Sequence, residues 1–273
     1  LDQSAESLTG RNLKLGLPAL TFEGSLCVCD WFDISIPREI LLVRFADAIR
    51  AALVESMTFG GYPEIVLSSN KQELLRELSS DYLWKDVLIA GLVKSPETLR
   101  RLLCLLAHQA GSEVSVSKLA SQLQIARSTV EKYIELLEQT FVIFRLQSFS
   151  TNMRKEVSKN KKIYFWDTGI RNALLGDLNC SPTRYDIRRL WKNWCMAEVA
   201  KWKMLSDDSC ELFFWRTRSH SEVDLVVRKG SRLRAFDMKW GGEKVKGRAF
   251  KEAYGIDVEL LSPENPFMDE ILA

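Results

Sequence analysis

The sequence predicts a multidomain protein of the α + α/β class, mainly helical in its first half and with an α/β unit at its end. Before residue 140, apolar residues recur at helical spacing in several stretches. After residue 210, short apolar runs rich in aromatic and β-branched residues predict strands. With 273 residues, 46 % of them hydrophobic, the chain can form two or three cores. We expect domains at 1–93, 94–180 and 181–273.

The first region begins with an alternating run, 13–18, which predicts one short strand ending at a proline. Residues 38–59 follow with apolar side chains at helical spacing and predict a helix. The motif Gly60-Gly61-Tyr62-Pro63 ends this helix. Residues 64–93 predict further helices.

Residues 94–180 have the pattern of a winged helix-turn-helix. The stretch 96–110 predicts one helix, and a second begins after Ser115 with the small Ala120 at the helix crossing. Ser128, with Glu131 three residues later, forms a capping box that predicts the start of a third helix. The apolar stretches 141–146 and 163–166 would be the strands of the wing.

The third helix of this unit can present basic side chains to nucleic acid. Arg127 and Lys132 point outward on the predicted helix, and five basic residues follow in or near the wing: Arg154, Lys155, Lys159, Lys161 and Lys162. Three glutamates on the same helix would repel phosphate: Glu131, Glu135 and Glu138. Because winged helices also bind proteins, a protein partner remains an alternative.

The last unit, 181–273, predicts a long helix over 184–204, three strands, a helix and a final strand. The expected strands are Glu211–Arg216, Glu222–Arg228, Arg232–Trp240 and Val258–Leu261, with the short helix over 247–254. If the second and third strands form a hairpin, Asp224 lies beside Asp237. Lys239 shares a face with Asp237, because side chains two apart on a strand point the same way.

Two carboxylates with a nearby lysine can bind a hard divalent cation and activate water beside a phosphate. Glu198 on the long helix is a candidate third carboxylate. The sequence therefore predicts a Mg²⁺ or Mn²⁺ site of Glu198, Asp224 and Asp237, with Lys239 as a catalytic residue beside Asp224 and Asp237. The alternative is an ordinary surface strand with alternating charges.

The order of helix glutamate, Asp224 and Asp237-x-Lys239 resembles the PD-(D/E)xK nuclease-like fold. That resemblance implies metal-dependent cleavage of nucleic acid. The chain departs from some members in one respect. They carry Gln-x-x-x-Tyr on the second helix, whereas here Phe250 precedes Tyr254.

Four further motifs come in the order seen in a bacterial and archaeal family of predicted AAA+-type ATPases. They are Leu8-Thr9-Gly10-Arg11, Gly60-Gly61-Tyr62-Pro63-Glu64, Tyr82-Leu83-Trp84-Lys85-Asp86 and Lys162-Ile163-Tyr164-Phe165-Trp166-Asp167-Thr168-Gly169-Ile170-Arg171. The resemblance implies a helical lid, a winged helix and a nuclease-like domain after a P-loop core. No G-x-x-x-x-G-K-[ST] motif is present in this sequence. We therefore expect a C-terminal fragment, 1–93 being a remnant of the core plus the lid, with no nucleotide-binding residues and ATP bound only by the longer parent.

Charge is distributed unevenly along the chain. Residues 145–251 hold 24 Lys and Arg against 12 Asp and Glu, a net charge of +12, although the whole chain has a net charge of only +2. Such a block attracts a phosphate backbone. No apolar run reaches the roughly 20 residues of a membrane helix, and no signal-peptide pattern opens the chain. The six scattered cysteines predict reduced thiols, and we expect a cytoplasmic protein without membrane contact.

Three functions remain open on the sequence. The leading one is a fragment of an AAA+-type ATPase that acts on nucleic acid through a winged helix and a metal-dependent nuclease-like domain. The second is a non-catalytic protein-interaction module with a degenerate nuclease fold. The third is a DNA-binding regulator gated by the ATPase.

Overall fold

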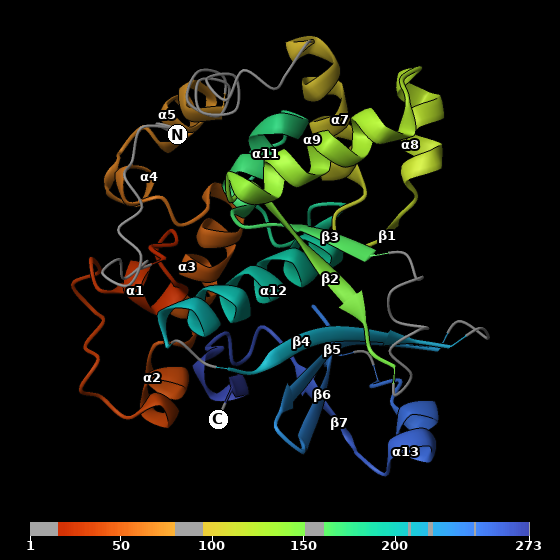
Figure 1. Cartoon of the computed structure of the whole chain (residues 1–273). Helices are drawn as coiled ribbons and strands as arrows, with labels where there is room; N and C mark the ends of the chain where they lie inside the picture. Colours follow the sequence, from red (N-terminus) through yellow and green to blue (C-terminus); the bar gives the residue numbers. More distant parts are fainter. Residues whose placement is uncertain are drawn as a thin grey trace, which may run out of the picture.

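A computed structural model describes residues 16–79, 95–150, 161–206, 209–217, 221–242 and 244–272. Within this part the chain has a mixed α/β fold around one seven-stranded sheet (Figure 1). Its strands are β1 (Glu113–Val114), β2 (Ile143–Ser148), β3 (Lys161–Phe165), β4 (Glu211–Arg216), β5 (Glu222–Lys229), β6 (Arg232–Met238) and β7 (Val258–Leu261). The helices of the first half are α1 (Phe22–Leu26), α2 (Arg38–Arg44), α3 (Ala46–Phe59), α4 (Pro63–Leu67), α5 (Lys71–Glu77), α7 (Pro96–His108), α8 (Val116–Leu123) and α9 (Arg127–Gln139). The later helices are α11 (Thr168–Leu175), α12 (Ile187–Leu205), α13 (Arg248–Tyr254) and the 3₁₀ helix η2 (Asp269–Leu272).

The sheet runs through two of the predicted domains. Its strand order is β1-β3-β2-β4-β5-β6-β7, and β2 pairs in parallel with β4 through Gln147↔Phe213 and Ser148↔Phe214. The hairpin of β2 and β3, which we expected as a wing, therefore extends the sheet of the last unit. β6 and β7 form a second parallel pair, and the other pairs are antiparallel.

Apolar side chains cover both faces of this sheet. The long helix α12 packs on one face, where Trp191 and Trp194 contribute to a core shared with Phe214 and Phe236. The short helix α13 covers the opposite face through Phe250. A third core lies between β1–β3 and the helices α7, α8, α9 and α11. Burial of these faces is the main force that holds the layers together.

Several element boundaries differ from the sequence-based expectations. The predicted helix 38–59 is divided at Phe45, whose backbone is not helical (φ −118°, ψ 25°). Helix α9 begins at Arg127 with Ala126 as its N-cap, so the prediction that Ser128 caps it is wrong. Of the predicted strand 13–18, residues 16–18 are described and form no strand. The sequence also did not predict α1, which Thr21 caps by accepting a hydrogen bond from the Gly24 N–H.

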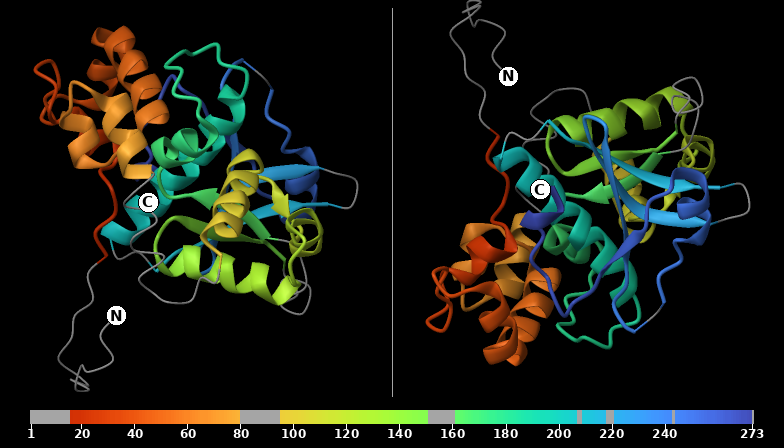
Figure 2. Two further views of the ribbon diagram at one scale, coloured as in Figure 1. Left: turned by 90° about the horizontal axis from the view of Figure 1, so that it is seen from above. Right: turned by 90° about the horizontal axis from the view of Figure 1, so that it is seen from below.

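The C-terminal end packs beside the N-terminal helices (Figure 2). Arg38 at the start of α2 pairs with Asp269 of η2 at 2.7 Å and with Glu23 of α1 at 3.0 Å. Its guanidinium group also lies 4.5 Å from the centre of the Phe267 ring, within cation–π range. The contacts of Arg38 with Asp269 and Phe267 join segments more than 200 residues apart.

The buried Asp167 joins two glycine-containing motifs, Gly60-Gly61-Tyr62-Pro63 and Asp167-Thr168-Gly169-Ile170. One carboxylate oxygen caps α11 by accepting from the Ile170 N–H at 3.0 Å, and the other accepts from the Gly61 N–H at 2.8 Å. Gly60 has φ +80°, and a Cβ there would lie 2.1 Å from the Asp167 carboxylate. The motif at 60–63 is thus adapted to a close approach between the end of α3 and the start of α11.

Replacing Gly169 by alanine should lower the free energy of unfolding by about 1–3 kcal/mol, the usual cost of overpacking a core. A Cβ at this position would lie 2.2 Å from the Phe59 carbonyl oxygen, so α11 must shift away from α3. Urea unfolding measures the loss. Gly241→Ala is the matched control, because a Cβ there meets no atom within 4 Å. Equal stability of the two variants would contradict the close approach.

Candidate active site

The strands β5 and β6 bring two aspartates together. Their antiparallel register pairs Leu225 with Phe236, and one further step places Asp224 opposite Asp237. A β-bulge lies at this point on the other side of β5. Phe213 and Trp215, two residues apart on β4, pair with Val226 and Val223, which are three apart. Bulges change the direction of side chains and are frequent beside functional sites.

Asp224 is buried, with 2 % of its surface exposed. Its Oδ1 lies 2.5 Å from the Lys192 Nζ of α12, and its Oδ2 accepts a hydrogen bond from the Met238 N–H at 2.9 Å. Burial raises the pKa of this carboxyl group, but the charges of Lys192 and Lys162 outweigh burial, and the pKa is lowered. Asp224 is therefore held as a carboxylate.

Asp237 is also buried, but its pKa shifts in the opposite direction from that of Asp224. Its Oδ2 accepts from the Lys246 N–H at 3.1 Å, and its Oδ1 lies 3.0 Å from the Lys239 Nζ. Burial, followed by a side-chain hydrogen bond with Asp224, raises the pKa of Asp237 above its ordinary value. A lowered pKa on one group and a raised pKa on the other are typical of two neighbouring carboxyl groups that cannot both ionise freely. The structure thus brings Asp224 and Asp237 together, with Lys239 in contact with Asp237.

Glu198 contacts other residues than Asp224 and Asp237. Its Oε2 accepts from the Phe22 N–H at 2.7 Å, and its Oε1 pairs with Lys201 Nζ at 2.8 Å. Lys201 also donates to the Leu20 carbonyl oxygen at 2.8 Å. Glu198 and Lys201 therefore hold the segment that leads into α1 against α12. Among the described residues, no group of three or more His, Cys, Asp or Glu side chains could hold a metal ion, so the predicted set with Glu198 does not form.

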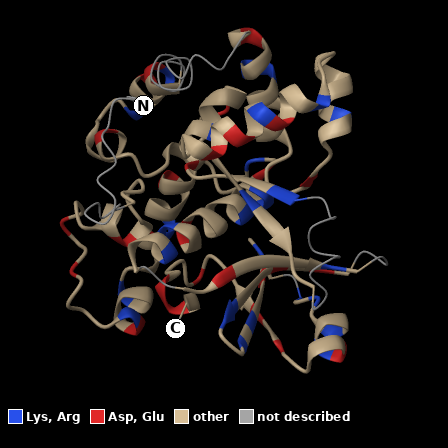
Figure 3. Ribbon diagram, viewed as in Figure 1, with Lys and Arg blue, Asp and Glu red and all other residues tan. Residues whose placement is uncertain are grey.

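The predicted nucleic-acid residues are spread over different environments. Arg127 and Lys132 are exposed on α9, whereas Lys162 is buried and its Nζ lies 2.5 Å from Glu222. Lys162 is thus not part of an exposed basic surface. Arg154, Lys155 and Lys159 lie outside the described residues. Figure 3 shows acidic residues beside basic ones on helices such as α9 and α13, which reduces the local excess of positive charge there.

Arg127 and Lys161 line one groove of about 500 Å³ between α9, the start of α8 and the strands β1–β3. Glu131 and Glu135 line the same groove. Arg127 lies 3.9 Å from Glu131, which partly neutralises it. The groove is therefore mixed in charge, as the glutamates of the predicted helix indicated.

The sequence did not indicate the roles of two charged residues near this site, Lys192 and Glu222. Lys192 of α12 reaches Asp224, and Glu222 pairs with Lys162 across the sheet. The charge block had included Lys192, but only the packing of α12 on the sheet shows its partner. A lysine placed among Trp191, Asn193 and Trp194, which are buried, is a weak signal that could have indicated a role at the helix–sheet interface.

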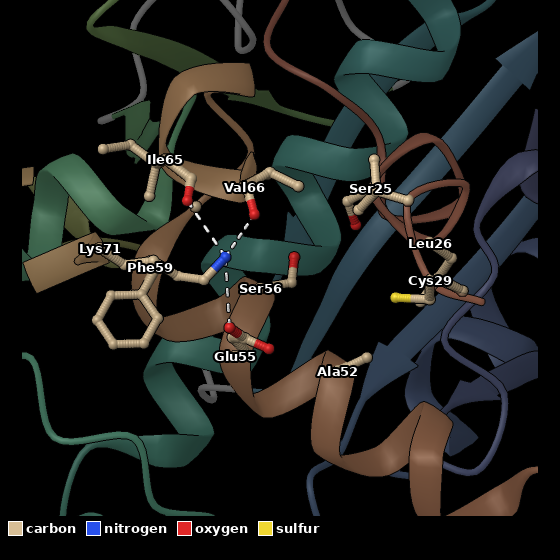
Figure 4. A pocket seen from close by; sticks show the side chains of 12 residues that line it. Ser25, Leu26, Cys29, Ala52, Glu55, Ser56, Phe59, Ile65, Val66 and Lys71 are labelled. Atoms are coloured by element: carbon tan, nitrogen blue, oxygen red, sulfur yellow. Dashed lines mark hydrogen bonds and ion pairs between the residues drawn. The ribbon is translucent and has the colours of Figure 1, made fainter. Parts of the chain in front are cut away.

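A second pocket lies among the N-terminal helices, with a volume of about 90 Å³ (Figure 4). Lys71 projects into it, and its Nζ lies 3.2 Å from the Ile65 carbonyl oxygen, 2.5 Å from that of Val66 and 3.5 Å from Glu55. Because three acceptors surround the ammonium group, we assign Lys71 a structural role. Cys29 also lines the pocket, and burial is the main cause that raises the pKa of its thiol.

Comparison with known proteins finds two domain families. Residues 50–180 match the domain of unknown function DUF8612, and residues 189–266 match the domain of unknown function DUF4143. No solved structure matches the chain. The chain is thus similar to these two domain families.

Relatives occur in bacteria and archaea. An uncharacterized protein of Mycobacterium tuberculosis is 28 % identical over 181 residues, which cover 66 % of this chain and 40 % of the relative. An uncharacterized protein of Methanocaldococcus jannaschii is 25 % identical over 231 residues, covering 82 % of this chain and 49 % of the relative. The chain therefore spans less than half the length of these relatives. In the part of the chain that the structure describes, no helix is both long and apolar enough to span a membrane.

Proposed function

We propose that this chain is part of an ATPase-family protein that acts on nucleic acid, and that its last unit is a PD-(D/E)xK nuclease-like domain with a divalent metal site at Asp224 and Asp237. The observation that carries the proposal is the meeting of the two buried carboxyl groups with the Lys239 ammonium group. The long helix, three antiparallel strands, short helix and parallel strand at 187–261 agree with that fold.

The residues present fit Mg²⁺ or Mn²⁺. Mg²⁺ prefers oxygen ligands, keeps several waters and is commonly bound by one or two carboxylates together with substrate phosphate. Asp224 and Asp237 supply such oxygens, and a cation would offset both the burial and the neighbouring Asp224 charge that raise the pKa of Asp237. When bound, the metal would polarise a phosphate and lower the pKa of a water molecule. Lys239 would stabilise the negative charge that develops on the phosphate.

We infer that α7–α9 and the β2–β3 hairpin form the part of the protein that contacts nucleic acid. Their order, helix, helix, helix and antiparallel hairpin, is that of a winged helix. Arg127 and Lys132 are exposed on its third helix. Phosphate contacts by these residues would position a strand without reading its sequence.

Addition of Mn²⁺ should raise the melting temperature of the protein, since an ion that binds only the folded state stabilises it by mass action. Asp224→Asn and Asp237→Asn should each abolish the increase, because each removes a carboxylate ligand. Differential scanning fluorimetry and isothermal titration calorimetry measure the two effects. Asp257→Asn is the control, because this exposed carboxylate pairs with Lys251 away from the site. A wild-type protein without a Mn²⁺ response would exclude the metal centre.

A non-catalytic interaction module is the second candidate, and one observation favours it. Every oxygen of the Asp224 and Asp237 carboxyl groups already has a partner, either a lysine or a backbone N–H. A satisfied, buried cluster of this kind can serve to hold β5, β6 and α12 together. Absence of a Mn²⁺ response would favour this second candidate.

A further inference from the structure

We propose that Lys192 is a built-in competitor of the divalent cation at the Asp224–Asp237 pair. This inference rests on the proposed function and adds a regulatory element to it. The Lys192 ammonium group lies against the Asp224 Oδ1 atom, which a metal would use. Metal binding then requires Lys192 to leave Asp224.

The two carboxyl groups have the same arrangement of partners. In each, one oxygen accepts from a backbone N–H, of Met238 for Asp224 and of Lys246 for Asp237. The other oxygen faces a lysine, at 2.5 Å for Lys192 and 3.0 Å for Lys239. The backbone contacts fix the orientation of the carboxyl groups. The Oδ1 atoms, now in contact with lysines, are therefore the ones that remain for a metal ion.

The ammonium group of Lys192 can leave its partner carboxylate more easily than those of Lys239 and Lys162. Its side chain is 29 % exposed, whereas that of Lys239 is 13 % exposed and that of Lys162 only 2 %. A lysine that already reaches solvent can turn its charged end outward while its aliphatic part stays packed. Lys162 is enclosed and has no such path.

The backbone around Lys192 is held firmly, so the exchange involves its side chain. The adjacent Asn193 both donates to the Phe165 carbonyl oxygen at 2.9 Å and accepts from the Phe165 N–H at 3.0 Å, which joins α12 to the end of β3. Trp191 and Trp194 stack with their ring centres 5.3 Å apart within the core. Displacement of the ammonium group therefore need not move α12.

Lys192→Met tests the inference, because methionine keeps most of the length of the side chain and removes its charge. Isothermal titration calorimetry with Mn²⁺ alone should give an affinity at least about tenfold higher for the variant than for the wild type, equivalent to about 1.4 kcal/mol. Without metal, the variant should melt at a lower temperature than the wild type, because Asp224 loses its counter-ion. Saturating Mn²⁺ should close that gap. Lys203→Met, on the same helix, is the control and should leave Mn²⁺ affinity unchanged.

Lys192→Arg provides a second variant that keeps the positive charge. It should bind Mn²⁺ no more tightly than the wild type, and it should fold even if the methionine variant does not. Equal Mn²⁺ affinity of the wild type and Lys192→Met, or tighter binding by Lys192→Arg, would overturn the competition while leaving the metal centre in place. Absence of Mn²⁺ binding in all of them would overturn the metal centre itself.

Discussion

Replacing Glu198 by alanine should lower the free energy of unfolding by about 3–5 kcal/mol, the usual cost of breaking a buried ion pair. The reason is that Lys201, whose side chain is 5 % exposed, would keep its charge without its partner carboxylate. The Phe22 N–H would lose its acceptor as well, so one of the contacts that hold the segment leading into α1 on α12 would be lost. Urea unfolding followed by tryptophan fluorescence measures the change.

The double variant Glu198→Ala/Lys201→Met separates lost charge pairing from lost packing. It should recover part of the stability, because it removes the unpaired cation together with the carboxylate. Mn²⁺ affinity of the Glu198→Gln protein should equal that of the wild type, since Glu198 contacts Phe22 and Lys201. A stable Glu198→Ala protein that has lost its Mn²⁺ response would return this residue to the metal site.

Replacing Lys239 by alanine should reduce Mn²⁺-dependent cleavage of DNA by about 10²–10³-fold, the typical effect of removing one group that stabilises transition-state charge. Mn²⁺ binding should persist, because both carboxylates remain and a competing cation beside Asp237 has been removed. Single-turnover cleavage of single-stranded and double-stranded DNA, with calorimetry on the same samples, measures both properties.

Lys246→Ala is the matched control for that experiment. Lys246 contacts Asp237 through its backbone N–H, while its side chain is exposed, so alanine preserves the hydrogen bond. Its cleavage rate should stay close to that of the wild type. If the wild-type protein binds Mn²⁺ but cleaves neither substrate, the nuclease proposal fails and the non-catalytic module becomes the better explanation.

Much of the last unit could be predicted from local patterns. The bounds of β4 and β7 agree with the stretches 211–216 and 258–261 that the sequence indicated, and the start of β5 and β6 agrees as well. Alternation along the predicted strand 232–240 placed Asp237 and Lys239 on one face, although β6 ends at Met238. These features depend on side chains only a few residues apart in the sequence. The geometry of a β-strand alone determines to which face of the sheet such side chains point.

The sequence by itself therefore determined the strands of the last unit and the pairing of Asp224 with Asp237. Only the tertiary structure decided the partners supplied by distant segments. Glu198 contacts Phe22, which is 176 residues away, and Lys192 reaches Asp224, 32 residues away. β2 joins β4 in one continuous sheet although more than 60 residues separate them. Such contacts depend on how helices and sheet pack together, and no local periodicity encodes which of several buried charges will meet.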